Sequence, residues 1–385
     1  MPNVPSRPQP PPLLSGEAGE LRLPSTMKHG GAVSMPHLAI QRPSKQGFDI
    51  VIGNPPYGAK LSDSDKKVLK AKYASAKTAD GRKGSLDTFS LFIELGYLML
   101  AKRGYSSFIV PLSVTASDAM SSLHQLLFDN CEIISVSSYG DRPKRIFESA
   151  EQQVSIISFQ KTGTTNKQLL TTHINKRYSD DSLWILLDNL RFVNSLGLTS
   201  FGRIPKIGTE IEKDILRKML ATSTKLGAIY DNQGKAVYYR KAGGRYYKII
   251  TTKATGSSAE GYITVKSKYY KVVAAILSSD LFYWFWLIHS DWHNLRTGEL
   301  EMVPIPIDKL TDEQITKINT AYDDYQKDLY NKCKYTKTGL RTFVARQSKP
   351  YINVLDDILC PLYGLSPKET EFIKNFEMEF RAADE

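Results

Sequence analysis

The sequence predicts an α/β fold in its first half, followed by a mixed α+β region and a helical C-terminal region. Three observations carry this prediction. β-Branched runs alternate with amphipathic helical runs between residues 48 and 161, as in a sheet whose strands are joined by crossover connections. Tyrosine, lysine and arginine concentrate after residue 201, and charged segments with helical spacing follow residue 309. A chain of 385 residues suffices for two or three domains.

The first 47 residues are rich in proline and carry no apolar pattern that a fold could bury. They hold 9 of the 19 prolines. Such a composition does not offset the entropy of ordering a chain, so residues 1–47 are expected to be a disordered tail or to reflect a misassigned start. They have neither the apolar core of a signal peptide nor the arginine-rich pattern of a transit peptide.

Regular structure is expected from Phe48 onward. The β-branched run over 48–53 predicts a buried strand, which ends where two prolines remove amide donors. Asp87 is expected to cap a helix that Gly104 closes. Further elements are predicted as strands over 106–110, 132–137 and 154–159 and a helix over 118–129. This sheet domain is expected to span 48–165, with a connector over 166–200.

Positive charge is concentrated in one quarter of the chain. Residues 201–296 contain 16 Lys or Arg and 7 Asp or Glu, and so carry +9 of the formal net charge of +11. A localised basic surface indicates an anionic partner such as nucleic acid. We expect a mixed α+β domain over 201–308 and a helical region over 309–385, which includes an amphipathic segment over 312–332 and a helix after Pro367.

The sequence argues against membrane, secreted and metal-binding proteins. No apolar run reaches the roughly 18 residues of a membrane helix, because Ser278, Ser279 and Asp280 interrupt the longest one. The three cysteines have no metal-ligand spacing and no even number for disulfides, so a reduced, cytoplasmic compartment and no metal are expected. Residues expected to be structural rather than ligand-binding are His289, His293, Trp284, Trp286 and Trp292.

The tetrapeptide Asn54-Pro55-Pro56-Tyr57 carries the most chemical information. An exocyclic amine on a ring is a poor nucleophile because its lone pair is conjugated. The Asn54 side chain and the Pro55 carbonyl could accept both of its N–H groups and turn the lone pair outward, while the prolines hold these acceptors in place. Tyr57 could stack on the ring. The alternative is a strand-terminating turn with a packed tyrosine.

Together, Phe48 to Gly58 resemble the catalytic motif of adenine-N6 DNA methyltransferases of restriction-modification systems, nearest to the TaqI-like and type IIG (Eco57I-like) enzymes. Later segments resemble parts of these enzymes in the same order, up to about Pro306: residues 85–94, 104–111, 145–148, 154–161, 277–285 and 303–306. The resemblance implies the second half of a Rossmann-like methyltransferase sheet, followed by a target-recognition domain. It also implies S-adenosylmethionine as cofactor and double-stranded DNA as partner.

The resemblance assigns roles to further residues. Phe147 is the expected second aromatic beside the flipped adenine, with Phe159 as the fallback, and Asp49 is assigned to cofactor binding. Basic residues expected to contact DNA are Lys235, Arg240, Lys241, Arg245 and Lys248. The alternative for this basic segment is a sheet with solvated basic edges.

The sequence departs from the family at one point. These enzymes bind the cofactor through a glycine-rich strand-turn-helix before the catalytic motif, and the 47 residues before Phe48 contain no such pattern. A strand taken from the middle of a parallel sheet would then expose an apolar edge, so we expect a partner chain that supplies the missing half, or a truncated reading frame. Any linked nuclease is expected elsewhere.

Three functions therefore remain open at the level of sequence. The first is an adenine-specific DNA methyltransferase fragment or subunit of a restriction-modification system. The second is a catalytically inactive DNA-binding remnant or specificity subunit, suggested by the absent cofactor turn. The third is an RNA or protein N-methyltransferase, because the same tetrapeptide serves such enzymes; the basic region argues against a glutamine acceptor.

Overall fold

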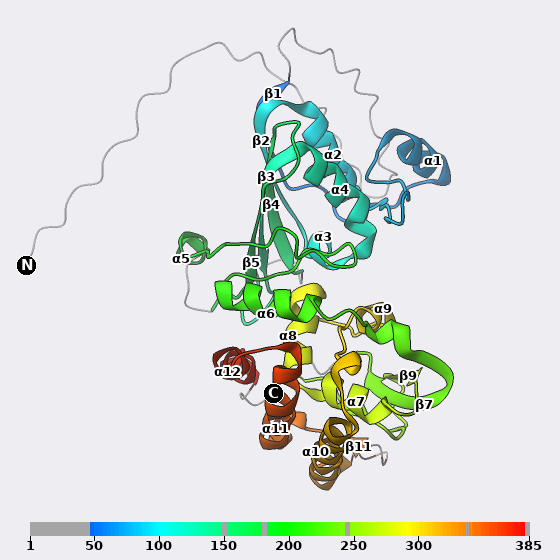
Figure 1. Cartoon of the computed structure of the whole chain (residues 1–385). Coiled ribbons are helices and arrows are strands. Elements are labelled where there is room, and N and C mark those ends of the chain that lie inside the picture. Colours follow the sequence, from blue (N-terminus) through cyan, green and yellow to red (C-terminus); the bar gives the residue numbers. More distant parts are fainter. Residues whose placement is uncertain are drawn as a thin grey trace, which may run out of the picture. The chain divides into compact units, whose positions relative to one another are not determined.

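The computed structural model describes residues 47–147, 152–178, 183–242, 247–335, 337, 339 and 341–381. A six-stranded sheet forms the first part, in the order β1-β2-β4-β3-β5-β6 (Figure 1). Its strands are β1 (Phe48–Gly53), β2 (Leu100–Pro111), β3 (Cys131–Tyr139), β4 (Val154–Lys161), β5 (Gln168–Asn175) and β6 (Val193–Asn194). The expectation for residues 1–46 lies outside the described part of the chain.

The pairing directions place four strand ends at one edge of the sheet. β1 is parallel to β2, β3 is parallel to β5, and β4 runs antiparallel to both β2 and β3. The carboxyl ends of β1, β2, β3 and β5 therefore lie at the same edge. In open α/β sheets ligands bind at this edge, so it is where the candidate residues need to be.

Two helices cover one face of the sheet. α2 (Thr88–Met99) and α4 (Ser121–Asn130) lie on the same side in Figure 1. Their apolar residues, such as Ile93 and Leu123, pack with Phe108, Ile134 and Ile157 of the strands in one buried cluster. Burial of this face holds the sheet rigid behind its carboxyl edge.

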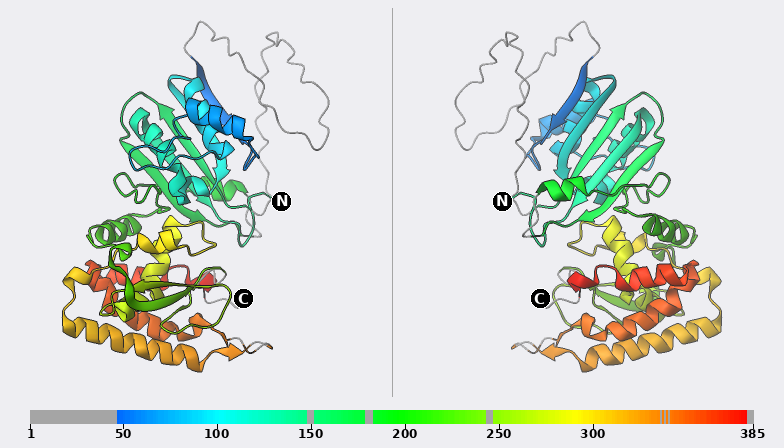
Figure 2. Two further views of the ribbon diagram at one scale, coloured as in Figure 1. Left: turned by 90° about the vertical axis from the view of Figure 1, so that its right-hand side faces the viewer. Right: turned by 90° about the vertical axis from the view of Figure 1, so that its left-hand side faces the viewer.

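The opposite face and the β1 edge are exposed in the described structure. Ile50 and Ile52 of β1 are 67% and 76% exposed, and Tyr105 of β2 is 56% exposed. Among the described residues β1 pairs only with β2, and the side views in Figure 2 show β1, in blue, at the edge of the sheet. Within the described residues β1 is therefore an exposed edge strand, whereas the β-branched run over 48–53 predicts a buried one.

The helix expected to run to Gly104 ends earlier. α2 ends at Met99 and β2 begins at Leu100, because the chain bulges as it pairs with β1: Leu100 lies opposite Phe48, whereas Tyr105 lies opposite Ile50. Asp87 stands at the N-cap position but makes no side-chain cap hydrogen bond. Gly104 belongs to the strand, where a Cβ atom would lie 2.8 Å from the carbonyl oxygen of Phe48.

The expectation that residues 166–200 form only a connector is wrong. β5 and β6 lie within it and extend the sheet, since β5 pairs with β3 along residues 168–175. The sequence shows only one short polar-apolar run there, and the pairing partner lies more than 30 residues upstream. The sheet therefore continues beyond the predicted boundary at residue 165.

The second part combines a small sheet with helices. A three-stranded sheet has the order β8-β7-β9. The strands are β7 (Tyr230–Arg240), β8 (Ile250–Thr251) and β9 (Glu260–Val265), and a two-stranded hairpin joins β10 (Lys334–Tyr335) to β11 (Arg341–Thr342). The larger helices are α6 (Glu210–Leu220), α7 (Tyr270–Ser278), α8 (Asp280–His289), α10 (Asp312–Asn331), α11 (Lys349–Leu359) and α12 (Pro367–Asn375). Shorter helices of this part are α9 (Thr297–Glu301) and α13 (Met378–Arg381), whereas α1 (Asp63–Lys72), α3 (Ser113–Ala116) and α5 (Leu183–Asp188) lie between strands of the six-stranded sheet.

The three-stranded sheet and the larger helices α6, α7, α8, α10, α11 and α12 share one hydrophobic core. The buried cluster runs from Ile174 of β5 to Ile373 of α12 and includes Trp284 and Trp292, which are fully buried. The expected boundary between residues 308 and 309 therefore does not separate two cores. The expectation that Trp284, Trp286 and Trp292 are core residues is confirmed.

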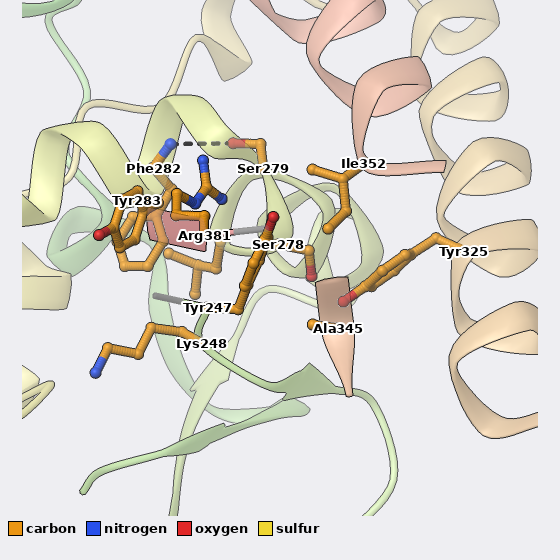
Figure 3. A pocket seen from close by; sticks show the side chains of 11 residues that line it. Tyr247, Lys248, Ser278, Ser279, Phe282, Tyr283, Tyr325, Ala345, Ile352 and Arg381 are labelled. Carbon is orange, nitrogen blue, oxygen red and sulfur yellow. Dashed lines mark hydrogen bonds between the residues drawn. The ribbon is translucent and has the colours of Figure 1, made fainter. Parts of the chain in front are cut away.

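Buried charged side chains connect the C-terminal helices α11 and α13 to α8. The Asp356 carboxylate of α11 accepts hydrogen bonds from the backbone amides of Asp280 and Leu281, both at 3.2 Å. Arg381 of α13 pairs with Asp280, and its guanidinium lies 4.3 Å from the ring centroids of both Tyr247 and Tyr283 (Figure 3). The last described residues are thus part of the fold of the second part.

No metal-ligating group of His, Cys, Asp or Glu occurs among the described residues. His289 is buried with Nδ1 2.9 Å from the carbonyl oxygen of Phe285, and His293 is exposed. Over the same residues no single helix is long and apolar enough to cross a membrane; α7 and α8 pass that test only as a pair bent by 70°, and both are buried in the core.

Candidate active site

The tetrapeptide Asn54-Pro55-Pro56-Tyr57 leaves β1 at the carboxyl edge of the sheet. Asn54 follows the last strand residue, Gly53, and is exposed, whereas Pro55 is buried and Tyr57 is half-buried. The β-branched run before it forms the strand, and the two prolines end the pairing. The side chain that the sequence singled out for chemistry is therefore open to solvent and held on a rigid strand end.

Tyr57 is held by two hydrogen-bond acceptors. Its hydroxyl lies 2.9 Å from Oδ1 of Asn54 and 3.0 Å from the carbonyl oxygen of Ile109 in β2. The ring packs against the cluster formed by the sheet, α2 and α4. Burial raises the pKa of Tyr57 above its ordinary value, so the hydroxyl keeps its proton at neutral pH and acts as a donor.

The backbone of the turn is fixed from α2. The hydroxyl of Thr88 donates a hydrogen bond of 2.6 Å to the carbonyl oxygen of Pro56. Gly58 follows with φ +67° in open space, which lets the chain turn away toward α1. With the Pro56 carbonyl engaged in this way, the roles of the Asn54 and Pro55 oxygens as acceptors for an amine stay a prediction.

Neither Thr88 nor Ile109 was singled out from the sequence. Thr88 stands in the quoted segment 85–94, but nothing local indicates its role, because its partner Pro56 lies 32 residues earlier. The Ile109 carbonyl is a backbone group 52 residues from Tyr57 and leaves no sequence signal. Both contacts follow from the parallel pairing of β1 with β2 and from the packing of α2.

Phe147 lies in the loop between β3 and β4, at the same edge of the sheet as Asn54. The register pairs Tyr139, the last residue of β3, with Val154, the first of β4, and Val154 also lies opposite Pro111 at the carboxyl end of β2. Phe147 is half-buried. Its role beside a base stays a prediction. The fallback Phe159 is 2% exposed inside the sheet core, and so cannot face a ligand in this fold.

The basic residues assigned to DNA separate into two groups. Lys235 and Arg240 on β7 and the adjoining Lys241 are exposed, with the Lys235 ammonium 4.7 Å from the ring centroid of Tyr270. The expectation that Lys248 contacts DNA is wrong for this fold. Lys248 is 5% exposed, and its ammonium lies 4.0 Å from the ring centroid of Trp286, in the core. Arg245 lies outside the described residues.

The described residues do not form a cradle for S-adenosylmethionine. Asp49, the residue assigned to the cofactor, is exposed on the edge strand β1. These residues therefore do not fit the cofactor on their own.

Two sizeable cavities lie away from the turn. One, of about 580 Å³, is lined by residues that include Lys83, His124 and Phe201. The other, of about 850 Å³, lies between the end of β5, α8 and α12. Neither is lined by Asn54 or Tyr57.

Comparisons with known proteins point to one family. Residues 26–147 match the family model of the Eco57I restriction-modification methylase. The match begins 22 residues before Phe48, upstream of the sequence-based domain boundary. It contains the whole tetrapeptide, β2 and Phe147.

Two curated relatives are similar in sequence over part of their length. The chain is 25% identical over 205 residues to the type II restriction enzyme and methyltransferase RM.Eco57I of Escherichia coli, which covers 52% of this chain and 19% of the relative. It is 34% identical over 84 residues to RM.MjaORFECS2P of Methanocaldococcus jannaschii, covering 22% and 6%. The matches thus span at most about a fifth of these relatives.

Among solved structures, the chain is similar to the type IIL restriction-modification enzyme MmeI in complex with DNA, with a TM-score of 0.49 and 13% sequence identity. That similarity covers 86% of this chain and 57% of the MmeI chain. It is also similar to the type IIG restriction endonuclease BpuSI, with a TM-score of 0.28 and 11% identity over 85% of this chain and 54% of that one.

Proposed function

We propose that the chain is the acceptor-binding and DNA-recognition portion of an adenine-specific DNA methyltransferase of a restriction-modification system, acting in the cytoplasm. The observation that carries the proposal is the exposed Asn54 at the carboxyl end of β1, inside the region that matches the Eco57I methylase family. A strand-terminating turn with a packed tyrosine would give no reason for an amide side chain to stand open at this edge.

The chain's own residues act on the amine. Oδ1 of Asn54 and the carbonyl oxygen of Pro55 each accept one N–H of the adenine N6 group, so the nitrogen lone pair turns out of the ring plane. Because the strand end and the prolines preset these acceptors, little reorganisation is needed in the transition state. The nitrogen would gain one bond to carbon as the sulfur–methyl bond of the donor breaks and leaves a thioether, and it would release one proton to water.

The methyl donor of the proposal is S-adenosylmethionine, whose sulfonium makes the methyl carbon electrophilic. The described residues do not hold it, so the proposal includes a second polypeptide segment, upstream in the chain or in a partner, that binds the cofactor. Its place is the β1 edge. The exposed Phe48, Ile50 and Ile52 offer an apolar strand to pair with, and the uncovered sheet face offers a surface to pack on.

Double-stranded DNA is the proposed substrate. An adenine inside a duplex cannot reach Asn54, so the nucleotide has to be flipped out, and Tyr57 and Phe147 would offset its lost stacking. The exposed cations Lys235, Arg240 and Lys241 on the second part of the fold would contact phosphates and so orient the duplex without reading its sequence.

The test is transfer of a labelled methyl group to unmethylated duplex DNA of mixed sequence, by the full chain with and without the candidate cofactor-binding polypeptide. N6-methyladenine is the expected product. Asn54→Ala is expected to lower kcat by about 100-fold or more, the effect of losing one preorganised electrostatic partner. Asn130→Ala, at the end of α4, is the control. Unchanged activity of Asn54→Ala would remove the proposed role of the amide.

A DNA-binding protein without transferase activity is the second candidate. The unpaired β1 edge within the described residues favours it, because a cofactor site needs neighbouring strands. This candidate requires salt-dependent DNA binding and no heat of binding when S-adenosylmethionine is titrated into the full chain. Assays of RNA and of glutamine-containing peptides as acceptors test the remaining alternative, an RNA or protein N-methyltransferase.

A further inference from the structure

The hydroxyl of Tyr57 has one proton and two acceptors within reach. Oδ1 of Asn54 is 2.9 Å away and the carbonyl oxygen of Ile109 is 3.0 Å away. Only one of them can receive the proton at a time. The Ile109 carbonyl belongs to β2 and is fixed by the sheet, whereas the Asn54 amide is exposed and can turn.

The orientation of this amide decides what the turn can bind. An asparagine side chain has an accepting end, Oδ1, and a donating end, Nδ2, and rotation by about 180° about its last bond exchanges them. An amine substrate needs the accepting end. With Oδ1 turned toward the Tyr57 hydroxyl, as in this structure, one of its two lone pairs is already engaged and the amide is held in this orientation.

We propose that the Tyr57 hydroxyl is a positioning group that sets the orientation of the Asn54 amide. In the state seen here it donates to Oδ1 and occupies one of the two lone pairs of that oxygen. In the receptive state it donates to the Ile109 carbonyl and its oxygen accepts from Nδ2, which turns Oδ1 outward to the substrate amine. This inference rests on the proposed function and adds to it a role for the hydroxyl, separate from stacking by the ring.

The surroundings of Tyr57 suit such a role. The ring is packed against the core cluster and so keeps the hydroxyl in place while the amide turns. Burial raises the Tyr57 pKa, so the hydroxyl stays a donor across the neutral range. Thr88 holds the neighbouring carbonyl of Pro56, which removes the backbone of the turn from the exchange. The amide is then the one exposed side-chain group of the tetrapeptide that has to move.

Tyr57→Phe isolates the hydroxyl because it keeps the ring. We expect kcat for methyl transfer to DNA to fall by about 10- to 100-fold, while KM for DNA changes by less than about threefold, since the base can still stack. Tyr57→Leu, which loses the ring, is expected to raise KM as well. If Tyr57 had only a structural role, Tyr57→Phe would not lower kcat while leaving KM for DNA nearly unchanged.

Asn54→Asp provides the matched background. A carboxylate has two equivalent oxygens and needs no orientation, so adding Tyr57→Phe to Asn54→Asp is expected to cost less than about threefold in kcat. An equal loss from Tyr57→Phe in the wild-type and Asn54→Asp backgrounds would overturn the positioning role. So would a Tyr57→Phe enzyme as active as the wild type, in which case the proposed function stands.

A second measurement does not depend on activity. Urea unfolding of Tyr57→Phe, Asn54→Ala and the double variant forms a cycle, and the hydrogen bond predicts a coupling of about three- to tenfold in the unfolding equilibrium constant. Additive effects would show that the contact is absent and overturn the inference. The remaining outcome is that the cycle shows coupling between Tyr57 and Asn54, but the wild-type chain methylates no acceptor even with its cofactor-binding partner present. This outcome would overturn both the proposed function and the catalytic role of the hydrogen bond.

Discussion

The Thr88 hydroxyl, on the first residue of α2, donates a 2.6 Å hydrogen bond to the carbonyl oxygen of Pro56. This contact joins the helix that covers the sheet to the turn that follows β1. Thr88 is 2% exposed, so its position is set by the core, and the core in turn sets the position of the second proline. Through Pro56, the oxygens of Asn54 and Pro55 are therefore held in a fixed position relative to the rigid core of the sheet.

Thr88→Val is expected to loosen the turn while keeping the shape of the side chain. Pro56 is exposed, so water can replace the lost hydroxyl and the free energy of unfolding should fall by only about 1 kcal/mol. Methyl transfer should fall about three- to tenfold, because the acceptors are less well placed. Urea unfolding and labelled methyl transfer measure the two effects. Thr88→Ser keeps the hydroxyl and should behave as the wild type; equal losses in both variants would contradict the role of this hydrogen bond.

Arg240→Ala and Lys241→Ala are expected to weaken DNA binding through lost phosphate contacts. Each should lower the slope of log K against log salt concentration by about one, for any duplex sequence. Lys248→Ala is the matched control from the same segment. Its ammonium lies over Trp286 in the core, so it should leave the slope unchanged and lower the free energy of unfolding by about 1–2 kcal/mol. If Lys248→Ala alone reduced the slope, Lys248 would contact DNA and Arg240 and Lys241 would not.

Two buried histidines should make the fold labile to acid. Burial lowers the pKa of His124 to about 4 and that of His289 to about 3, whereas both would take a proton near pH 6.5 in the unfolded chain. Because the folded pKa is the lower one, the stabilisation is complete above pH 6.5 and is lost as the pH falls toward 4. Each histidine then contributes a slope of about 1.4 kcal/mol per pH unit.

His124→Gln tests this contribution. Glutamine retains an N–H group that can reach the carbonyl oxygen of Val114, the present partner of Nε2, but it does not titrate. Urea unfolding between pH 7 and pH 4.5 should show a slope reduced by about 1.4 kcal/mol per pH unit relative to wild type. An unaltered slope in His124→Gln would show that burial does not lower the pKa of His124 below its value in the unfolded chain.

The sequence predicted those features that depend on local pattern. The strand over 48–53, its end at two prolines, and the helices after Asp312 and Pro367 all appear in the structure, because β-branching, missing amide hydrogens and helical spacing act within a few residues. The prediction that this strand is buried was wrong, because β1 pairs on one side only among the described residues and Ile50 and Ile52 are exposed.

Features that depend on tertiary packing were not predicted. Lys248 looked like its exposed neighbours in a basic run, yet the fold turns it onto Trp286. The strand β5 was taken for part of a connector because its partner β3 is distant in the chain. The shared core of α7, α8 and α10 removed a boundary that composition suggested at residue 308. In each case a contact between distant segments decides the outcome.

Phe147 and Phe159 offer the sharpest separation of function from stability. Phe147→Ala should lower kcat/KM for DNA about tenfold, the value of roughly one lost base-stacking contact, with little change in the free energy of unfolding. Phe159→Ala should lower the free energy of unfolding by about 3–5 kcal/mol, because Phe159 is 2% exposed within the sheet core. Fluorescence of 2-aminopurine at the target position reports base flipping independently of transfer, and should fall in Phe147→Ala alone. If Phe147→Ala destabilised the fold and left flipping intact, the second aromatic partner of the base would have to come from another segment.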